Sequence, residues 1–378
     1  MWYGRNTADD DDVHSVYTDF SRAFDKVSHK LLLHKMERQF GIQNNVLLWF
    51  SSYLSNRQQY VIFNGTESSW ANVTSGDPQG SIFVPTLISL YVNDLPEVVQ
   101  SLGCLLFADD SKLFKRVSSI TDCLLLQRDI ESLIQWCSDW KNSLNLDKCY
   151  FIKFSNKRKE VFDFIYTMFD SPISRVKEIK DLGVTFTSSF SFDKHINIIT
   201  AKSFRFPGFL KRTMKPFKDP AVLFSLYNSY IRSRLEYCSL IWSPSSVAMS
   251  DKIERVQKKF LKFVSFQCNL DSSLSYDEKC QYFKIQTLSS RRKVSEVVFI
   301  NKVYNNKIDC QSILQDLAFY VPSRRIRQRD LFYTRPRINI RKNSPLQRAM
   351  TCANSSNLDV FDGIVAFKRK ARSYFSVP

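Results

Sequence analysis

Short strand-like runs and longer helix-like segments alternate along the first half of the chain. In the runs, apolar residues follow one another or alternate with polar ones, whereas in the segments they recur every three or four positions. Strands are predicted at 13–18, 59–64, 71–74, 150–154 and 179–186. Helices are predicted at 28–40, 44–54, 82–92 and from about 124 to 140.

The second half of the chain has a helical and basic character. Helices are predicted at 192–211, 220–242, 251–264 and 297–304, whereas 323–342 has the composition of an Arg-rich loop. Glycine marks expected stops and turns: Gly41 closes a helix, Gly65 lies within a hairpin, and Gly183 interrupts the strand at 179–186. The pattern therefore predicts an α+β first half followed by helices.

Two adjacent acids interrupt an apolar run near residue 110. The run Leu105–Phe107 stops at Asp109 and Asp110, and apolar residues resume at Leu113, which predicts a strand that turns back as a hairpin. Neighbouring carboxylates repel each other, and a divalent cation such as Mg²⁺ removes that penalty because hard cations take carboxylate oxygens. Exposed Asp-Asp turns are common, so this motif taken alone more often marks an ordinary turn.

Two further motifs precede the Asp-Asp hairpin. Asp19 follows the strand at 13–18, and a Gly-Pro-Gly loop, 76–81, opens the helix predicted at 82–92. An acid after one strand, a glycine-rich loop before a helix and an Asp-Asp hairpin, in that order, form the signature of a polymerase palm.

With these motifs the sequence resembles the reverse transcriptases of non-LTR retrotransposons, particularly the jockey-like and CR1-like elements of animals. The segments that carry the likeness are DFSRAFDKVSHKLLLHKM (19–36), DPQGSIFVPTLISLYVNDLP (77–96) and LLFADDSKLF (105–114). Further matches are LNLDKCYFIKFS (144–155), KDLGVTFTSSFSFDKHI (180–196) and RSRLEYCSLIWSP (232–244). The resemblance therefore extends across nearly the whole chain.

The resemblance implies an α+β fold in three parts. A right-hand polymerase palm, with an antiparallel sheet packed on helices, would occupy residues 1–190. A helical thumb would follow in 191–265, and a basic, mostly helical C-terminal region in 266–378. The implied activity is that of an RNA-directed DNA polymerase, with an RNA template, a DNA primer and deoxynucleoside triphosphates as its partners.

The resemblance also implies a metal site. Asp19, Asp109 and Asp110 would hold two Mg²⁺ or Mn²⁺ ions, which lower the pKa of the primer hydroxyl and neutralise the leaving pyrophosphate. Asp25, in the same motif as Asp19, is interpreted as a helix or turn cap. Lys148 matches the family lysine that assists pyrophosphate departure as a proton donor, although a solvated lysine at the start of a strand would look the same.

Four residues are assigned by resemblance to the nucleotide and the template. Phe24 matches the bulky ring beneath the incoming sugar, where it would clash with a ribose 2′-hydroxyl, and Phe20 is grouped with it. A core phenylalanine would look identical in sequence. Gln79 matches the residue that contacts the template strand, and Gly80 lets the backbone approach nucleic acid closely.

Several features depart from the family pattern. Asp77 stands where an aliphatic residue is usual and would repel phosphate, and Val84 stands where glycine is usual and could crowd the helix. The segment that precedes the first catalytic acid in the family is missing, and so is an endonuclease domain. We therefore expect a shortened or decayed reading frame that is a poor polymerase.

Charge is distributed unevenly. Residues 1–150 carry 13 Lys/Arg against 18 Asp/Glu, a net −5, whereas the remaining 228 carry 41 against 19, a net +22. Such a basic half suits an enzyme that holds a polyanion, although a solvated basic surface without a ligand has the same composition. The expected nucleic-acid contacts on the helix at 251–264 are Arg255, Lys258, Lys259 and Lys262.

Composition excludes some classes. No apolar run approaches about 20 residues, so no membrane span is predicted. The nine cysteines include no Cys-x-x-Cys spacing, which favours a reducing compartment and no zinc site. We expect an intracellular protein of the nucleus, the cytoplasm or both. The alternative function is a catalytically inactive, retrotransposon-derived remnant that still binds nucleic acid.

Overall fold

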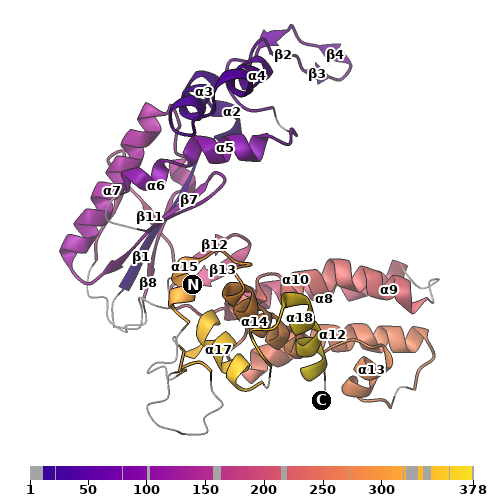
Figure 1. The fold of residues 1–378 in the computed structure, drawn as a ribbon. Coiled ribbons are helices and arrows are strands. Elements are labelled where there is room, and N and C mark those ends of the chain that lie inside the picture. The colour runs from indigo at the N-terminus through magenta and orange to yellow at the C-terminus, as the bar shows by residue number, and fades with distance from the viewer. Residues whose placement is uncertain are drawn as a thin grey trace. The chain divides into compact units, whose positions relative to one another are not determined.

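The computed structural model has two compact units, residues 10–177 and residues from 178 onward, and each is described by itself (Figure 1). The residues that the structure describes are 12–21, 23–78, 80–99, 103–155, 163–213, 219–271, 273–317, 319–320, 331–334, 342–356 and 358–376. Both helices and strands occur, so the fold is α+β as predicted.

A five-stranded sheet organises the first unit. Its strand order is β11-β8-β1-β7-β6, with β1 at the centre. β1 pairs antiparallel with β7 and β8, β6 pairs antiparallel with β7, and only β11 runs parallel to its neighbour, β8. The strands are β1 (Asp12–Asp19), β6 (Gly103–Phe107), β7 (Asp110–Val117), β8 (Tyr150–Phe154) and β11 (Ser174–Arg175).

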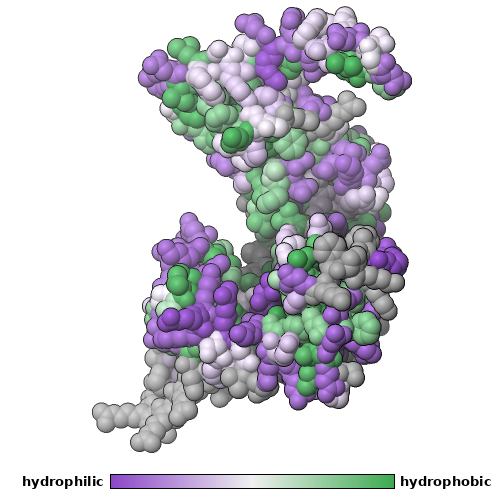
Figure 2. Space-filling view, turned by 90° about the vertical axis from the view of Figure 1, so that its right-hand side faces the viewer, coloured by the Kyte–Doolittle hydropathy of each residue, from purple (hydrophilic) through white to green (hydrophobic). Residues whose placement is uncertain are grey.

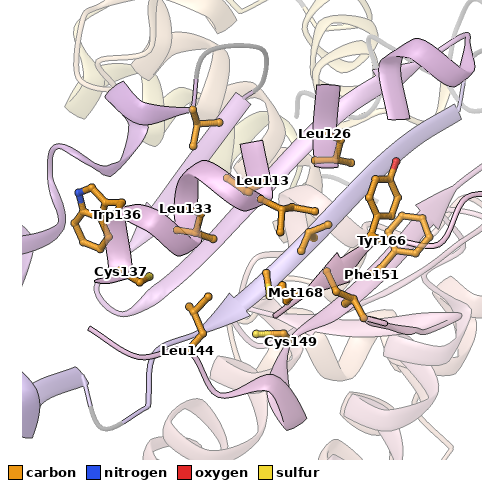
Figure 3. Packing of buried hydrophobic residues seen from close by; sticks show 14 of the residues in the cluster. Leu113, Leu126, Leu133, Trp136, Cys137, Leu144, Cys149, Phe151, Tyr166 and Met168 are labelled. Carbon is orange, nitrogen blue, oxygen red and sulfur yellow. The ribbon is translucent and has the colours of Figure 1, made fainter. Parts of the chain in front are cut away.

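Helix α7 (Ile120–Asp139) covers one face of this sheet. A capping box between Ser119 and Asp122 begins the helix. Its apolar residues recur at helical spacing and meet side chains from the strands and from the small hairpin of β9 (Thr167–Met168) and β10 (Ser171–Pro172) (Figure 3). Each fully buried leucine in such a cluster contributes roughly 1.5–3 kcal/mol, so the sheet is held rigidly against α7.

Beyond β1, the chain builds a group of helices and a hairpin ribbon. The helices are α2 (Ala23–Lys26), α3 (His29–Arg38), α4 (Asn44–Leu54), α5 (Val84–Val92) and α6 (Leu95–Val98). The ribbon consists of β2 (Gln58–Gln59), β3 (Ile62–Phe63), β4 (Thr66–Glu67) and β5 (Ala71–Asn72). Leu32, Leu87 and Tyr91 belong to a second core that joins these helices. In the part of the first unit that carries α4 and the ribbon, hydrophobic residues are exposed among hydrophilic ones (Figure 2), including Val61, Ile62, Phe63 and Trp70.

A fully buried lysine connects α3 to its neighbours. The Lys35 ammonium donates to the Tyr91 carbonyl and to Asp94 Oδ1, both at 2.5 Å, and lies 3.6 Å from the ring centroid of Trp140. Trp136 Nε1 donates to the same Asp94 oxygen at 3.2 Å. Burial lowers the pKa of Lys35, while Asp94 opposes that shift. The network joins α3, α5, α6 and α7 in one body.

The second unit begins with a hairpin and continues as helices. The hairpin is β12 (Glu178–Asp181) with β13 (Val184–Thr187). One core joins α8 (Asp193–Thr213), α9 (Pro220–Leu226), the π-helical η3 (Tyr227–Arg232), α10 (Ser233–Glu236), α11 (Ser239–Trp242), α12 (Val247–Gln267) and α13 (Tyr276–Tyr282). Another joins α14 (Leu288–Tyr304), α15 (Gln311–Gln315), α17 (Pro345–Asn354) and α18 (Ile364–Tyr374). None of the described helices is both long and apolar enough to cross a membrane.

Buried charges join the two cores of the second unit. Glu254 of α12 accepts from the backbone N–H groups of Leu288 and Ser289, at 2.9 and 3.2 Å, where α14 begins. Arg348 of α17 donates to Glu296 at 3.0 Å and to the Leu240 carbonyl at 2.5 Å. Removing one partner of a buried pair costs more than a surface contact is worth, so these groups make the unit cohesive.

Most predicted elements are confirmed, including the strand at 13–18, the helix at 44–54, the helix at 82–92 despite Pro85, and the strand at 150–154. Pro85 is tolerated because it lies in the first turn of α5. Two predictions are wrong. The single strand expected at 179–186 is a hairpin, because Leu182 and Gly183 both adopt positive φ and reverse the chain.

The single helix expected at 220–242 is also wrong. It breaks at Tyr237–Cys238, where Cys238 has a φ of +51°. The break turns Trp242 into the core, where it is fully buried and its Nε1 donates to the Tyr237 carbonyl at 2.7 Å. Most of the Arg-rich loop expected at 323–342 lies outside the described residues.

Candidate active site

Two carboxylates face each other across the central strands of the sheet. Asp19 is the last residue of β1 and Asp110 the first of β7, and the ladder register pairs them directly. Directly opposed residues of an antiparallel pair hold their Cβ atoms roughly 4.5–5.5 Å apart and direct their side chains to the same face. Strands that end in acids at the same edge therefore place two carboxylates side by side.

A tight turn adds a third carboxylate at this edge. Phe107 of β6 pairs with Asp110, so the hairpin is closed by Ala108 and Asp109 alone. Ala108 adopts a φ of +53°, the left-handed conformation that such two-residue turns require. Asp109 is half-buried and Asp110 exposed. The predicted hairpin is thus confirmed.

Lys148 lies beside Asp19 because of backbone contacts from a distant segment. Asn145 N–H donates to the Asp19 carbonyl at 2.8 Å, and Ser21 N–H donates to the Ser143 carbonyl at 2.7 Å. The 3₁₀ turn η2 (Leu146–Lys148) then brings the Lys148 ammonium to 3.1 Å from Asp19 Oδ2. The hydrogen bond to Asp19 raises the pKa of Lys148, and the charges of Asp19 and Asp109 raise it further.

The residues next to the facing carboxylates are buried and hold them in place. Thr18 and Ser111 precede and follow the facing acids, pair in the ladder, and are 3% and 2% exposed. Their hydroxyl groups hydrogen-bond to each other. This contact fixes the register directly under Asp19 and Asp110, since a slip of one residue would separate the two hydroxyls.

The donor set fits divalent cations, although it is not gathered around one point. Three carboxylates from a strand end and a turn are the oxygen ligands that Mg²⁺ and Mn²⁺ take. Within the described ranges, no group of three His, Cys, Asp or Glu side chains is close enough to hold a metal ion. The Lys148 ammonium instead neutralises Asp19. Cation binding would therefore need small side-chain rotations and the release of Lys148.

The Gly76–Gly80 loop is bound to α2 by its backbone. Gly76 N–H donates to the Val27 carbonyl and Asp77 N–H to the Phe24 carbonyl, both at 2.9 Å. Gly76 has a φ of +85°, and a Cβ there would lie 2.8 Å from the Asp25 carbonyl oxygen, so only glycine fits. The loop thus lies directly against the residue predicted to face the sugar.

The remaining predicted nucleotide contacts have different surroundings. The Phe20 ring is 4% exposed and packs 6.2 Å from the Trp136 ring, so its side chain belongs to the core and only its backbone can meet a ligand. Phe24 is half-buried against the helical core. Gly80 is exposed with a φ of +87° and open space beside it. Gln79 lies outside the described residues.

Sequence reasoning misjudged Asp77 and overlooked its neighbour. The side chain of Asp77 is 6% exposed, so it lies beneath the loop instead of facing phosphate as expected. Burial raises the pKa of this carboxyl to about 6, and the positive charge of Arg57 opposes the shift. Nothing in the sequence around Arg57, which follows α4, indicates that its charge acts on Asp77. Val84, the other departure, is buried at the start of α5.

The four predicted basic contacts share one exposed face of α12. Arg255, Lys258, Lys259 and Lys262 are all exposed, whereas Val256 and Phe260 of the opposite face are fully buried. Lys258 lies 4.9 Å from the ring centroid of Tyr276, and Lys259 lies 5.6 Å from that of Phe204. Spacing of three and four residues aligns these charges along the helix.

Comparison with known proteins shows the family of the chain. The model of the family described as reverse transcriptase (RNA-dependent DNA polymerase) matches residues 5–209, which is more than half of the chain. The RNA-directed DNA polymerase from mobile element jockey of Drosophila melanogaster is 29% identical over 192 residues, 49% of this chain and 20% of that protein. Its Drosophila funebris counterpart is 27% identical over 264 residues, 66% of this chain and 28% of that protein.

The chain therefore spans between a fifth and a third of the length of these curated relatives. Among solved structures, telomerase from Candida tropicalis in complex with a TWJ fragment of telomeric RNA is 12% identical, with a TM-score of 0.42. That match covers 75% of this chain and 44% of that one.

Proposed function

Because the chain belongs to the reverse transcriptase family, we propose that it is an RNA-directed DNA polymerase of the non-LTR retrotransposon type. It would extend a DNA primer along an RNA template with deoxynucleoside triphosphates. The observation that carries the proposal is the direct pairing of Asp19 with Asp110, with Asp109 in the adjoining turn. Nucleotidyl transfer needs carboxylates from separate strands near one point. This edge of the sheet carries three, which would gather around metal ions once Lys148 releases Asp19.

Asp19, Asp109 and Asp110 would hold two Mg²⁺ or Mn²⁺ ions. When bound, the ions neutralise phosphate charge and lower the pKa of the primer 3′ hydroxyl. The protein's own part is to position the reactants and to supply a proton. Lys148 is exposed, and like an ordinary lysine it is protonated at neutral pH, so its ammonium can donate to the departing pyrophosphate.

The loop and α2 would form the nucleotide and template side of the site. Phe24 would exclude a ribose 2′-hydroxyl, and Gly80, which has no side chain, would let nucleic acid approach the backbone. Gln79 would contact the template. The main chain of Phe20, not its buried ring, would face the triphosphate.

In this proposal residues 1–190 act as the palm, 191–265 as a helical thumb and 266–378 as a basic C-terminal region. The exposed face of α12 with Arg255, Lys258, Lys259 and Lys262 would hold the phosphate backbone of the template–primer duplex. Such contacts position nucleic acid without reading its sequence. Since its substrates are intracellular, we expect the protein in the nucleus, the cytoplasm or both.

Primer extension on an RNA template tests the proposal. The unmodified chain should incorporate deoxynucleotides slowly in the presence of Mg²⁺ or Mn²⁺, and Asp109→Ala should abolish incorporation. Asp139→Ala, which removes an exposed acid at the end of α7, is the matched control and should leave extension unchanged. Equal extension by Asp109→Ala would reject the assigned site, and no extension under any metal condition would reject the activity.

A second candidate is a nucleic-acid-binding remnant without catalysis. It is favoured by the ion pair of Lys148 with Asp19 and by the lack, among described residues, of a gathered metal-ligand group. Its signature would be salt-sensitive binding of RNA–DNA hybrid without extension in any divalent metal.

A further inference from the structure

Asp77 has no part in the chemistry proposed above, yet it is one of the most confined acids in the first unit. It is 6% exposed, and neither side-chain oxygen has a hydrogen-bond partner in the described part of the chain. Leaving a buried carboxylate unpaired is costly, and such groups in native proteins are nearly always satisfied. A cation close to Asp77 would remove this cost.

Arg57 is the candidate, because its guanidinium is also incompletely satisfied. Its Nη1 is buried and has no hydrogen-bond partner among the described residues. It is also the cation whose charge acts on Asp77, whose pKa it lowers. The two side chains therefore each have buried, unsatisfied polar atoms of opposite charge, although they are not in direct contact in the structure. The Val73 N–H, which bonds to the Arg57 carbonyl, ties Arg57 to the segment that leads into Asp77. The other titratable neighbours are Tyr91, whose phenol is affected by the charge of Asp77, and His29.

The backbone decides which of the two side chains can move. Asp77 is fixed to α2 through its N–H, and the adjoining Gly76 carbonyl accepts from His29 Nε2 at 2.7 Å. Ser75 Oγ holds the same segment by donating to the Asp25 carbonyl at 3.0 Å. Arg57 lies in the short link between α4 and β2, where its carbonyl accepts from Val73 N–H at 2.8 Å. The pairing proposed below requires a rotation of the long Arg57 side chain toward Asp77.

We propose that Arg57 and Asp77 form a buried ion pair that holds the Gly76–Gly80 loop against α2 and thereby positions Phe24. The route is short, since Asp77 N–H bonds directly to the Phe24 carbonyl at 2.9 Å. Arg57 and Asp77 are positioning residues, because neither touches substrate. The part of the inference that concerns sugar selection rests on the proposed function, whereas the ion pair itself does not.

As a consequence, Arg57, which lies just before the first strand of the ribbon, would influence the selection between deoxyribose and ribose. With the pair intact, the position of Phe24 is fixed, and the 2′-hydroxyl of a ribonucleotide clashes with its ring. Without the pair, the loop and the Phe24 backbone gain freedom, and small displacements of a positioning group commonly change rates by about tenfold or more. Loss of the pair should therefore lower the discrimination between deoxynucleotides and ribonucleotides more than it lowers the turnover rate.

A double-mutant cycle on the full chain tests the pair without requiring polymerase activity. The variants are Arg57→Gln, Asp77→Asn and their combination, with Arg38→Gln on the exposed surface of α3 as the matched control. Unfolding midpoints are measured from pH 4 to pH 8. If the pair forms, Arg57→Gln lowers the midpoint at neutral pH, and adding Asp77→Asn restores it, so the two effects are not additive.

The pH profile provides a second readout. In Arg57→Gln the Asp77 carboxyl keeps the pKa-raising effect of burial and loses the opposing charge of Arg57, so its pKa lies above the value of about 6 in the unmodified chain. Stability of this variant is therefore highest in acid and falls as the pH rises toward and through that raised pKa. The combined variant should lose that slope. Additive effects with parallel pH profiles would overturn the pair. If Arg57→Gln does not fold, Arg57→Lys, which keeps the charge, must fold for the proposal to survive.

The functional part is tested by the ratio of kcat/KM for deoxynucleotides to that for ribonucleotides. We expect Arg57→Gln to lower this ratio about tenfold, mainly through KM, whereas Arg38→Gln leaves it unchanged. An unchanged ratio in an active Arg57→Gln chain would overturn the link to Phe24. If the unmodified chain does not extend primers, the proposed function fails, and the unfolding cycle still decides whether the pair exists.

Discussion

The ammonium of Lys148 lies 3.1 Å from the Asp19 carboxylate. Asp109 and Asp110 lie at the same edge of the sheet. A cation from the protein thus occupies the place where a metal ion would neutralise the same oxygen. In the proposed function a metal ion would compete with the Lys148 ammonium for Asp19, and this competition is measurable.

We predict that Lys148→Gln binds Mn²⁺ more tightly than the unmodified chain does. Loss of the ammonium leaves Asp19 free for the metal, and because exposed ion pairs are weak the gain should stay below about tenfold. Metal titration followed by electron paramagnetic resonance measures it, with Lys141→Gln as an exposed control. The same variant should extend primers more slowly, because it lacks the proton donor. Unchanged Mn²⁺ affinity would show that Lys148 does not compete at this site.

Gly76 and Gly80 should respond differently to substitution by alanine. Both have positive φ, so both variants carry a strain of roughly 1–2 kcal/mol. Only at Gly76 would the new Cβ also lie 2.8 Å from the Asp25 carbonyl oxygen, whereas nothing lies within 4 Å at Gly80. Gly76→Ala should therefore lose most extension activity and also lower the unfolding midpoint more. Similar midpoints for the two variants would contradict the close approach of the loop to α2.

The Lys35 network should carry much of the stability of the first unit. Lys35→Met leaves the Asp94 carboxylate half-enclosed without its main cation, and breaking a buried pair costs about 3–5 kcal/mol. Chemical denaturation followed by tryptophan fluorescence measures the loss. Adding Asp94→Asn should recover part of it, since the uncompensated charge is then removed while the contact with Trp136 can persist. A loss below about 1 kcal/mol for Lys35→Met would contradict a central role for the network.

The local sequence pattern was sufficient to predict the Asp-Asp hairpin. Strand-like apolar residues lie on both sides of the two acids, and few structures other than a hairpin fit this pattern. The proximity of Asp19 and Asp110 follows from the antiparallel register. The contact of Lys148 with Asp19 depends instead on the hydrogen bond between Asn145 and Asp19, which joins segments far apart in sequence. Only the family resemblance pointed to it.

Burial explains the residues that sequence reasoning misplaced. The family pattern places Asp77 beside the nucleotide, which predicts repulsion of phosphate, whereas its side chain is buried. Acids are almost never fully buried, so the sequence gives no sign of this burial. Phe20 was grouped with the nucleotide site, yet alternation along β1 directs its ring toward Trp136. The break of the predicted helix at Cys238 could not be predicted either, since it depends on how Trp242 packs in the core.

The basic face of α12 should show its role through salt. Each lysine that contacts phosphate releases a counterion, so removing one should reduce the slope of log affinity against log salt by about 0.9 for a duplex. We expect Lys259→Gln and Lys262→Gln in the full chain each to have this effect on RNA–DNA hybrid binding, measured by fluorescence anisotropy. The affinity should fall to a similar extent for hybrids of unrelated sequence, because phosphate contacts carry no base information. Lys30→Gln, exposed on α3 of the other unit, serves as the control and should leave the slope unchanged. If the Lys30 and Lys259 variants shifted the slope equally, binding would reflect the general charge of the chain and not this helix.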